Sequence, residues 1–318
     1  MNILISTAHI GALDIKSLLT QLGHRVHIVS YSDHNFIRGW STQPKDYREQ
    51  FYIDENYCEE WYSQHRTFHN YDLYIVFYPP PQTFLFIPSN KPCIMVLPVR
   101  YEYYFSQNKH TWDHIDNLIR KYIDRGQLTL IANGKYDQKY AEHYLDRKVE
   151  LIESICDYNG EPHYTGKNNK WILDAPFDLD GYDNLTKLPP NYKYEDLCDY
   201  KGVVHFPYNV STMSWYERYY LNLPHIVPSI KWALDFSPPC FKEIEWTKNN
   251  QRETWNWRQN LHLADFYQYP LVEQVDNMVE LTQMMKLIDC NEISGKMKLI
   301  NKERKNIALE QWKKVLEG

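Results

Sequence analysis

The sequence predicts an α/β protein of two domains, each with a parallel sheet covered by helices. A chain of 318 residues is too long to fold around one small hydrophobic core. In the N-terminal half, short apolar runs alternate with helix-length amphipathic stretches, the pattern of strand, helix and strand units. Residues 157–169 are rich in turn formers, and the same alternation resumes after them.

The first half begins with a compact strand, helix and strand. Residues 2–6 form an apolar strand, residues 12–22 a helix with leucines on one face that ends at Gly23, and residues 25–30 a second strand. The remaining elements expected here are strands at 73–78, 93–97 and 128–132, helices at 55–65, 111–125 and 135–145, and an extended stretch at 149–155.

The second half repeats the alternation with shorter elements. We expect strands at residues 171–173, 202–206 and 225–227, and helices at 194–199, 211–221, 271–287 and 296–316. The domains predicted from this division are residues 1–156 and 157–300, followed by a C-terminal helix at 301–318.

Composition excludes several classes of protein. Lys and Arg number 35 against 41 Asp and Glu, so the net charge of −6 provides no cationic field for nucleic acid. No apolar run reaches the roughly 20 residues of a membrane helix, and the first residues do not resemble a signal peptide. The six cysteines lie far apart, which favours reduced thiols and a cytoplasmic protein.

Aromatic residues are abundant, with 27 Tyr, 10 Trp and 12 Phe. Aromatic side chains provide platforms for sugar rings and bases, but they also fill cores. Composition alone leaves both interpretations open.

Residues 202–224 hold the most informative pattern. An apolar strand ends at Pro207, and Ser211 and Thr212 can cap the helix that follows. The N-terminus of such a helix, at the carboxyl edge of a parallel sheet, suits a diphosphate. Glu217 lies about one and a half turns into the helix, where its carboxylate could accept both hydroxyls of a ribose.

This strand, the capped helix with Glu217, and the Leu223-Pro224 turn resemble the donor half-site of GT-B glycosyltransferases. The resemblance implies two Rossmann-like domains facing across a cleft, with the C-terminal helix returning to the first. It implies transfer of a hexose or deoxyhexose, without a metal or other cofactor, from a UDP, GDP or dTDP sugar to a glycan or another hydroxyl acceptor. The residues expected to bind the donor are Tyr208, Asn209, Ser211, Thr212, Met213, Glu217 and Lys167.

One departure bears on the mechanism. Retaining members commonly carry an acid eight positions before the ribose-binding Glu, and that position is Asn209 here. We therefore favour inversion, in which a base of the first domain deprotonates the acceptor. His9, after the first strand, is one candidate base, and Gly11 beside it allows close backbone approach.

The loop at residues 98–107 loosely resembles the base-carrying loop of phage DNA glucosyltransferases, and a viral source would place the protein in the host cytoplasm. Pro98 stands where those enzymes align their acid, so Glu102 would have to act as the base. Arg100 and Tyr101 are then expected on the acceptor side. An Arg100–Glu102 ion pair of purely structural role is the alternative.

Two other functions remain open at this point. Asp178 and Asp180 match the D-x-D pattern that holds Mn²⁺ or Mg²⁺ in another class of glycosyltransferase, although they lie in a loop rich in turn formers. The protein could also be a non-catalytic carbohydrate-binding or assembly protein on the same scaffold. The sequence has no zinc spacing, no G-x-G-x-x-G and no P-loop, which argues against dehydrogenases and P-loop kinases.

Overall fold

The computed structural model describes residues 1–7, 11–30, 54–101, 109–177, 179, 182–188, 192–235, 240–241 and 254–318. The chain divides into two compact units. The first comprises residues 1–154 with 308–318, and the second comprises residues 155–307. The division between 154 and 155 lies two residues before the boundary expected after residue 156.

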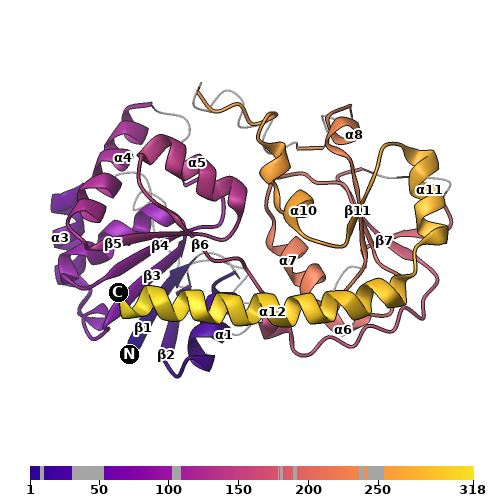
Figure 1. Ribbon diagram of the computed structural model, residues 1–318. Coiled ribbons are helices and arrows are strands. Elements are labelled where there is room, and N and C mark those ends of the chain that lie inside the picture. The colour runs from indigo at the N-terminus through magenta and orange to yellow at the C-terminus, as the bar shows by residue number, and fades with distance from the viewer. Residues whose placement is uncertain are drawn as a thin grey trace. The chain divides into compact units, whose positions relative to one another are not determined.

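The first unit has a six-stranded sheet within the described residues, in the order β2-β1-β3-β4-β5-β6, and every strand pair is parallel. In Figure 1, α4 and α5 lie on one side of this sheet and α1 on the other. All strands expected here form. The inner strands β1, β3, β4 and β5 are apolar runs that are mostly buried, whereas the edge strands β2 and β6 are only half-buried. The elements are β1 (Asn2–Thr7), α1 (Ala12–Gln21), β2 (Arg25–Ser30), α3 (Glu55–Gln64), β3 (Leu73–Tyr78), β4 (Cys93–Leu97), α4 (Lys109–Asp124), β5 (Leu128–Ala132), α5 (Lys135–Leu145) and β6 (Glu150–Leu151).

The second unit has a five-stranded parallel sheet within the described residues, in the order β11-β10-β9-β7-β8. Its elements are β7 (Trp171–Asp174), β8 (Leu185–Lys187), α6 (Tyr194–Leu197), β9 (Val203–His205), α7 (Met213–Tyr220), β10 (His225–Pro228), α8 (Ile230–Asp235), α10 (Asp265–Gln268), β11 (Val272–Val275) and α11 (Met278–Leu287). The helix expected over 271–287 is wrong in its first part, because residues 272–275 pair with β10 as strand β11.

Both sheets have the same topology around their first strand. In the first unit β1 lies between β2 and β3, and in the second unit β7 lies between β8 and β9. In each sheet, the second strand therefore pairs with one edge of the first strand and the third strand pairs with its other edge. At such a topological switch point the carboxyl ends of the two flanking strands open a crevice, which is where open α/β sheets bind ligands.

The C-terminal helix α12 (Cys290–Glu317) begins well before the expected residue 301. Its residues 290–307 belong to the second unit and residues 308–317 to the first. None of the helices in the described residues is long and apolar enough to cross a membrane.

Gly202, directly before β9, provides a test of the packing under the second sheet. A Cβ on Gly202 would lie within 3.0 Å of the Pro224 carbonyl oxygen and of ring carbons of the buried Trp171. We expect Gly202→Ala to lower the free energy of unfolding by about 1–3 kcal/mol through overpacking.

Gly295 is the matched control, because a Cβ there meets nothing within 4 Å and the residue lies inside α12. Gly295→Ala should stabilise the protein by about 1 kcal/mol through helix propensity. Urea unfolding measures both variants. Equal stability of the two would contradict the close packing at Gly202.

Candidate functional site

A carboxylate and an imidazole lie at the topological switch point of the second unit, between β7 and β9. Asp174 is the last residue of β7 and His205 the last of β9, and the two are direct partners across the strands. His205 Nδ1 lies 2.5 Å from Asp174 Oδ2. Arg218 of α7 donates through Nη2 to the same oxygen, and also to Ser214 Oγ at 3.2 Å. One carboxylate therefore connects two strands and a helix.

This cluster is buried except at Asp174. The side chain of His205 is fully buried, that of Arg218 is 2% exposed, and that of Asp174 is 21% exposed. Burial by itself raises the pKa of the Asp174 carboxyl, but the charges of Arg218 and His205 and the hydrogen bond from His205 lower it well below its usual value. Asp174 is thus ionised at neutral pH. Its second oxygen, Oδ1, has no hydrogen-bond partner among the described residues.

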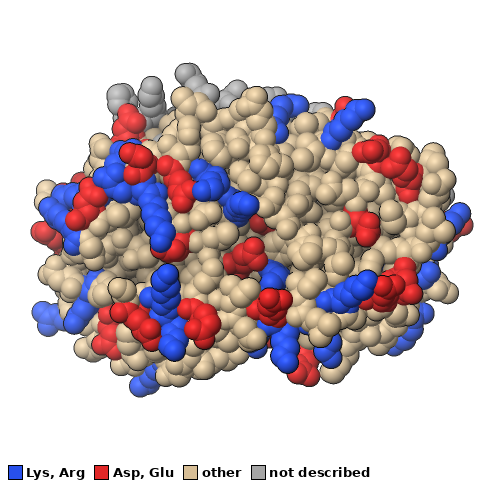
Figure 2. Space-filling model, viewed as in Figure 1, with Lys and Arg blue, Asp and Glu red and all other residues tan. Residues whose placement is uncertain are grey.

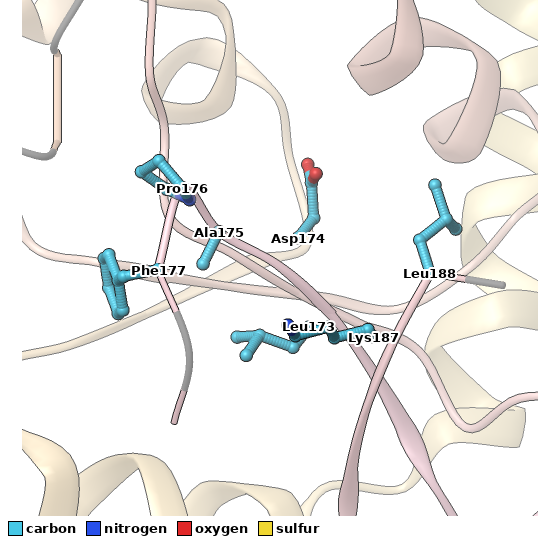
Figure 3. Close-up of a pocket in the computed structure, with 7 residues that line it drawn as sticks. All are labelled: Leu173, Asp174, Ala175, Pro176, Phe177, Lys187 and Leu188. Atoms are coloured by element: carbon cyan, nitrogen blue, oxygen red, sulfur yellow. The ribbon is translucent and has the colours of Figure 1, made fainter. Parts of the chain in front are cut away.

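A cavity of about 440 Å³ opens beside Asp174. Figure 3 shows that its lining comes from two segments, the end of β7 with the loop that follows it and the end of β8. The ring of Phe177 packs edge-on against Phe206 at 4.9 Å, which ties the loop after β7 to the end of β9. The lining residues are Leu173, Asp174, Ala175, Pro176, Phe177, Lys187 and Leu188.

The N-terminus of α7 lies close to Asp174, one of the residues that line this cavity. Thr212 is the N-cap, and its side chain accepts from the Trp215 N–H at 3.3 Å. The N–H groups of Met213 and Ser214, in the first turn, have no partner within the helix, and the helix dipole makes this end positive. Because Arg218 Nη2 bonds both Ser214 and Asp174, the first turn lies next to the cavity wall.

The predicted donor residues 208–213 gather at this helix start, but two of them point inward. Ser211 Oγ lies 3.1 Å from the Tyr216 hydroxyl, which donates to Asp265 at 2.5 Å, all buried. Asn209 Oδ1 accepts from the Val210 N–H at 2.8 Å. Tyr208 and Met213 are half-buried. Ser211 and Asn209 therefore shape the loop that presents the helix N-terminus.

Glu217 does not line the cavity. The residue is 5% exposed, and its Oε1 accepts hydrogen bonds from the hydroxyls of Tyr158 and Tyr194, the latter at 2.6 Å. A ribose at this oxygen would have to displace two tyrosine hydroxyls. Ribose binding by Glu217 stays a prediction, and its contacts favour a structural role that holds η4 (Asp157–Asn159) and α6 against α7.

Lys167 lies at the opposite edge of the sheet. Its Nζ pairs with Asp199 Oδ2 at 2.8 Å, and its side chain is 71% exposed. Lys167 comes shortly before β7 and Asp199 shortly before β9, so both lie at the amino ends of these parallel strands. Contact of Lys167 with the donor phosphates stays a prediction, and this placement at the amino ends does not favour it.

In the first unit, the expected acceptor-side residues follow the carboxyl ends of β1 and β4. Gly11 is the N-cap of α1 and Arg100 is 5% exposed. Tyr101 is buried, and its hydroxyl donates to Asp116 Oδ1 at 2.8 Å. The hydroxyl is therefore hydrogen-bonded inside the first unit. The candidate bases His9 and Glu102 lie outside the described residues.

A metal site is not found in the part of the chain that the structure describes, where no three His, Cys, Asp or Glu side chains come together. Asp178 and Asp180 are outside the described residues, so their role stays a hypothesis.

The sequence reasoning missed Asp174, His205 and Arg218. A signal was available: Asp174 and His205 each follow an apolar strand, and carboxyl ends of neighbouring parallel strands meet at one edge.

The fold of this chain is similar to that of solved glycosyltransferases. HepE (Alr3699) of Anabaena, in a structure with UDP and glucose, matches with a TM-score of 0.58 at 11% identity, over 100% of this chain and 99% of that chain. SnogD from Streptomyces nogalater matches with a TM-score of 0.50 at 10% identity, over 100% and 99%. The protein has the GT-B glycosyltransferase fold, as the resemblance in its sequence implied. No protein-family model matches the sequence, and no curated protein matches it.

The contacts of Glu217 generate a prediction. Glu217→Ala leaves two tyrosine hydroxyls without their acceptor and should lower the free energy of unfolding by about 1–3 kcal/mol. The affinity for UDP should change less than about threefold, because the tyrosines and not the nucleotide occupy Oε1. Urea unfolding and calorimetry measure the two quantities.

Glu195→Ala is the control, because Glu195 is exposed at the start of α6. This substitution should change the free energy of unfolding by less than about 0.5 kcal/mol. Unchanged stability of Glu217→Ala together with a tenfold loss of UDP affinity would restore the ribose-binding role.

Proposed function

We propose that this protein transfers a sugar from a nucleotide-sugar donor to a hydroxyl acceptor. The observation that carries the proposal is the cavity at the carboxyl ends of β7 and β8, with the first turn of α7 close to its Asp174, in a chain with the GT-B fold. A parallel sheet of this topology binds ligands at that edge.

The donor diphosphate fits the first turn of α7. The N–H groups of Met213 and Ser214 point out of the helix start, and such donors with a positive dipole end bind phosphate without a metal ion. Lys187, which lines the neighbouring cavity, adds a cation at the same edge. This arrangement supports the expectation of a metal-independent transferase.

Asp174 is the group best suited to accept hydroxyls of the donor. It is ionised, lines the cavity and has Oδ1 unoccupied within the described residues, while Oδ2 is held by Arg218 and His205. A carboxylate accepts hydrogen bonds only, so it favours the hydroxyl-rich sugar or ribose over the anionic phosphates. We assign to Asp174 the chemistry that the sequence suggested for Glu217.

Inversion remains the favoured stereochemistry. The position that carries an acid in retaining relatives is Asn209, and its amide oxygen is buried and bonded to the Val210 N–H. Nothing at that position can act as an acid or base. An inverting reaction needs a base from the first unit, and we keep Glu102 and His9 as the candidates.

The donor base and the acceptor are proposed only by class. HepE is solved with UDP and glucose, which makes UDP-glucose the first donor to test ahead of GDP and dTDP sugars. Hexose or deoxyhexose transfer to a glycan or another hydroxyl compound remains the proposed reaction. On the face seen in Figure 2, acidic and basic side chains are interspersed, which together with the net charge of −6 supports a partner other than nucleic acid.

Calorimetric titration with UDP-glucose tests the proposal. Asp174→Asn should lower the affinity by about 10- to 100-fold, because a charge-assisted hydrogen bond is worth about 1.5–3 kcal/mol. Since Asp174→Asn also leaves Arg218 without its charge partner, Ala175→Phe is the second variant. It fills the cavity, leaves the Asp174 cluster intact, and should abolish binding while the protein stays folded.

Lys167→Ala is the control and should bind like the wild type, since Lys167 lies at the amino edge. Wild-type affinity in both Asp174→Asn and Ala175→Phe would refute the site. UDP release from UDP-glucose should persist in EDTA. Binding without any release or transfer would favour the non-catalytic alternative, and activity lost in EDTA and restored by Mn²⁺ would favour Asp178 and Asp180.

A further inference from the structure

Arg100 is a buried arginine with an unsatisfied donor. It follows the carboxyl end of β4 in the first unit and is 5% exposed. Its Nη1 is fully buried and has no hydrogen-bond partner among the residues that the structure describes. Within the described residues, Arg100 has no ion pair either.

Asp116, a buried carboxylate of the same unit, already has other partners, and Glu102 lies outside the described residues. Asp116 accepts the hydroxyl of Tyr101 and lies 3.8 Å from Arg120 Nη2. Arg120 illustrates what a structural arginine does in this unit, because it donates to the carbonyls of Leu145 at 3.0 Å and Tyr144 at 2.8 Å. Arg100 makes no comparable contact among the described residues.

A buried guanidinium without a partner is unfavourable in a folded protein, because it stays protonated and loses its water. Such groups persist where a ligand supplies the partner, and the carboxyl edge of a parallel sheet is the edge at which ligands bind. The planar guanidinium matches phosphate or carboxylate oxygens in pairs. Arg100 therefore has the location and the chemistry of an anion-binding group.

We propose that Arg100 binds a negatively charged group of the acceptor, so that the sugar is transferred to an anionic compound, phosphorylated or carboxylated. The inference rests on the proposed function, in which the donor diphosphate occupies the second unit and the first unit binds the other substrate. A neutral acceptor would leave the guanidinium unpaired, so the charged acceptor is preferred.

Binding of three probes to the full chain tests this proposal. Glucose 6-phosphate, glucuronate and glucose share a sugar ring and differ in charge. Saturation-transfer NMR measures their affinities with UDP present at saturation, so that the donor site is filled. We expect one of the two anions to bind at least tenfold more tightly than glucose, and the stronger of them identifies phosphate or carboxylate as the recognised group.

Arg100→Gln should remove this preference while UDP binds as before. Its thermal midpoint should equal or exceed that of the wild type, because a buried unpaired charge is lost. Arg100→Lys keeps the charge without the planar geometry and should retain only part of the preference. Arg120→Gln is the control, and it should lower the midpoint and leave the preference unchanged.

Equal affinities of the three probes for the wild type would overturn the proposal. So would a lowered midpoint of Arg100→Gln with the anion preference retained, the result expected of a structural arginine. UDP binding in the same samples reports on the proposed function separately. Its absence would refute the donor site, whereas intact UDP binding without anion preference would refute only the role of Arg100.

Discussion

The hydrogen-bonded ion pair of Asp174 with Arg218, joined by His205, is the interaction on which the second unit's site depends. It fixes the ends of β7 and β9 and the first turn of α7 relative to one another. The arrangement has a cost, because Arg218 Nε and His205 Nε2 are buried and have no hydrogen-bond partner in the described part of the chain. Apolar residues would pack at this place without the cost of unpaired polar groups. We therefore explain the cluster by the way it positions β7, β9 and α7, and not by a gain in the stability of the fold.

Electrostatics around this cluster favour a single charge state. Asp174 stays ionised because Arg218 and His205 lower its pKa more than burial raises it. His225, at the start of β10, is fully buried, and burial together with the charge of Arg218 lowers its pKa well below the usual value. His225 is therefore neutral at physiological pH. The site thus presents a fixed negative charge beside a helix end that attracts anions, which separates a hydroxyl-binding region from a phosphate-binding one.

Tyrosine hydroxyls make several of the other buried and half-buried hydrogen bonds to acidic side chains. These tyrosines share their acidic partner with a lysine or arginine in two cases. Their rings fill the core while their hydroxyls satisfy carboxylates without adding charge. Core filling, one of the two interpretations of the aromatic composition, therefore describes these residues. The pairs are Tyr122 with Glu55, Tyr101 with Asp116, Tyr158 and Tyr194 with Glu217, and Tyr216 with Asp265.

The sequence predicted the first sheet well, because its inner strands β1, β3, β4 and β5 are short, mostly apolar runs. It failed at β8, which has only three residues, and at β11, where Val272 and Val275 fit the helical period that continues into α11. The start of α7 was predictable from its capping residues. The partners of Glu217 were not, since Tyr158 lies 59 residues away and hydroxyl donors leave no pattern. Asp174 and Arg218 are likewise joined over 44 residues by the fold alone.

Hydrogen exchange with and without UDP-glucose tests the central claim most directly, because it locates the ligand on the intact chain without a substitution. The account predicts slower exchange at residues 173–177 and 211–216, the cavity wall and the start of α7, with no change at residues 165–170 near Lys167. Protection confined to the amino edge, or none at residues 173–177 and 211–216 when the ligand is bound, would contradict it.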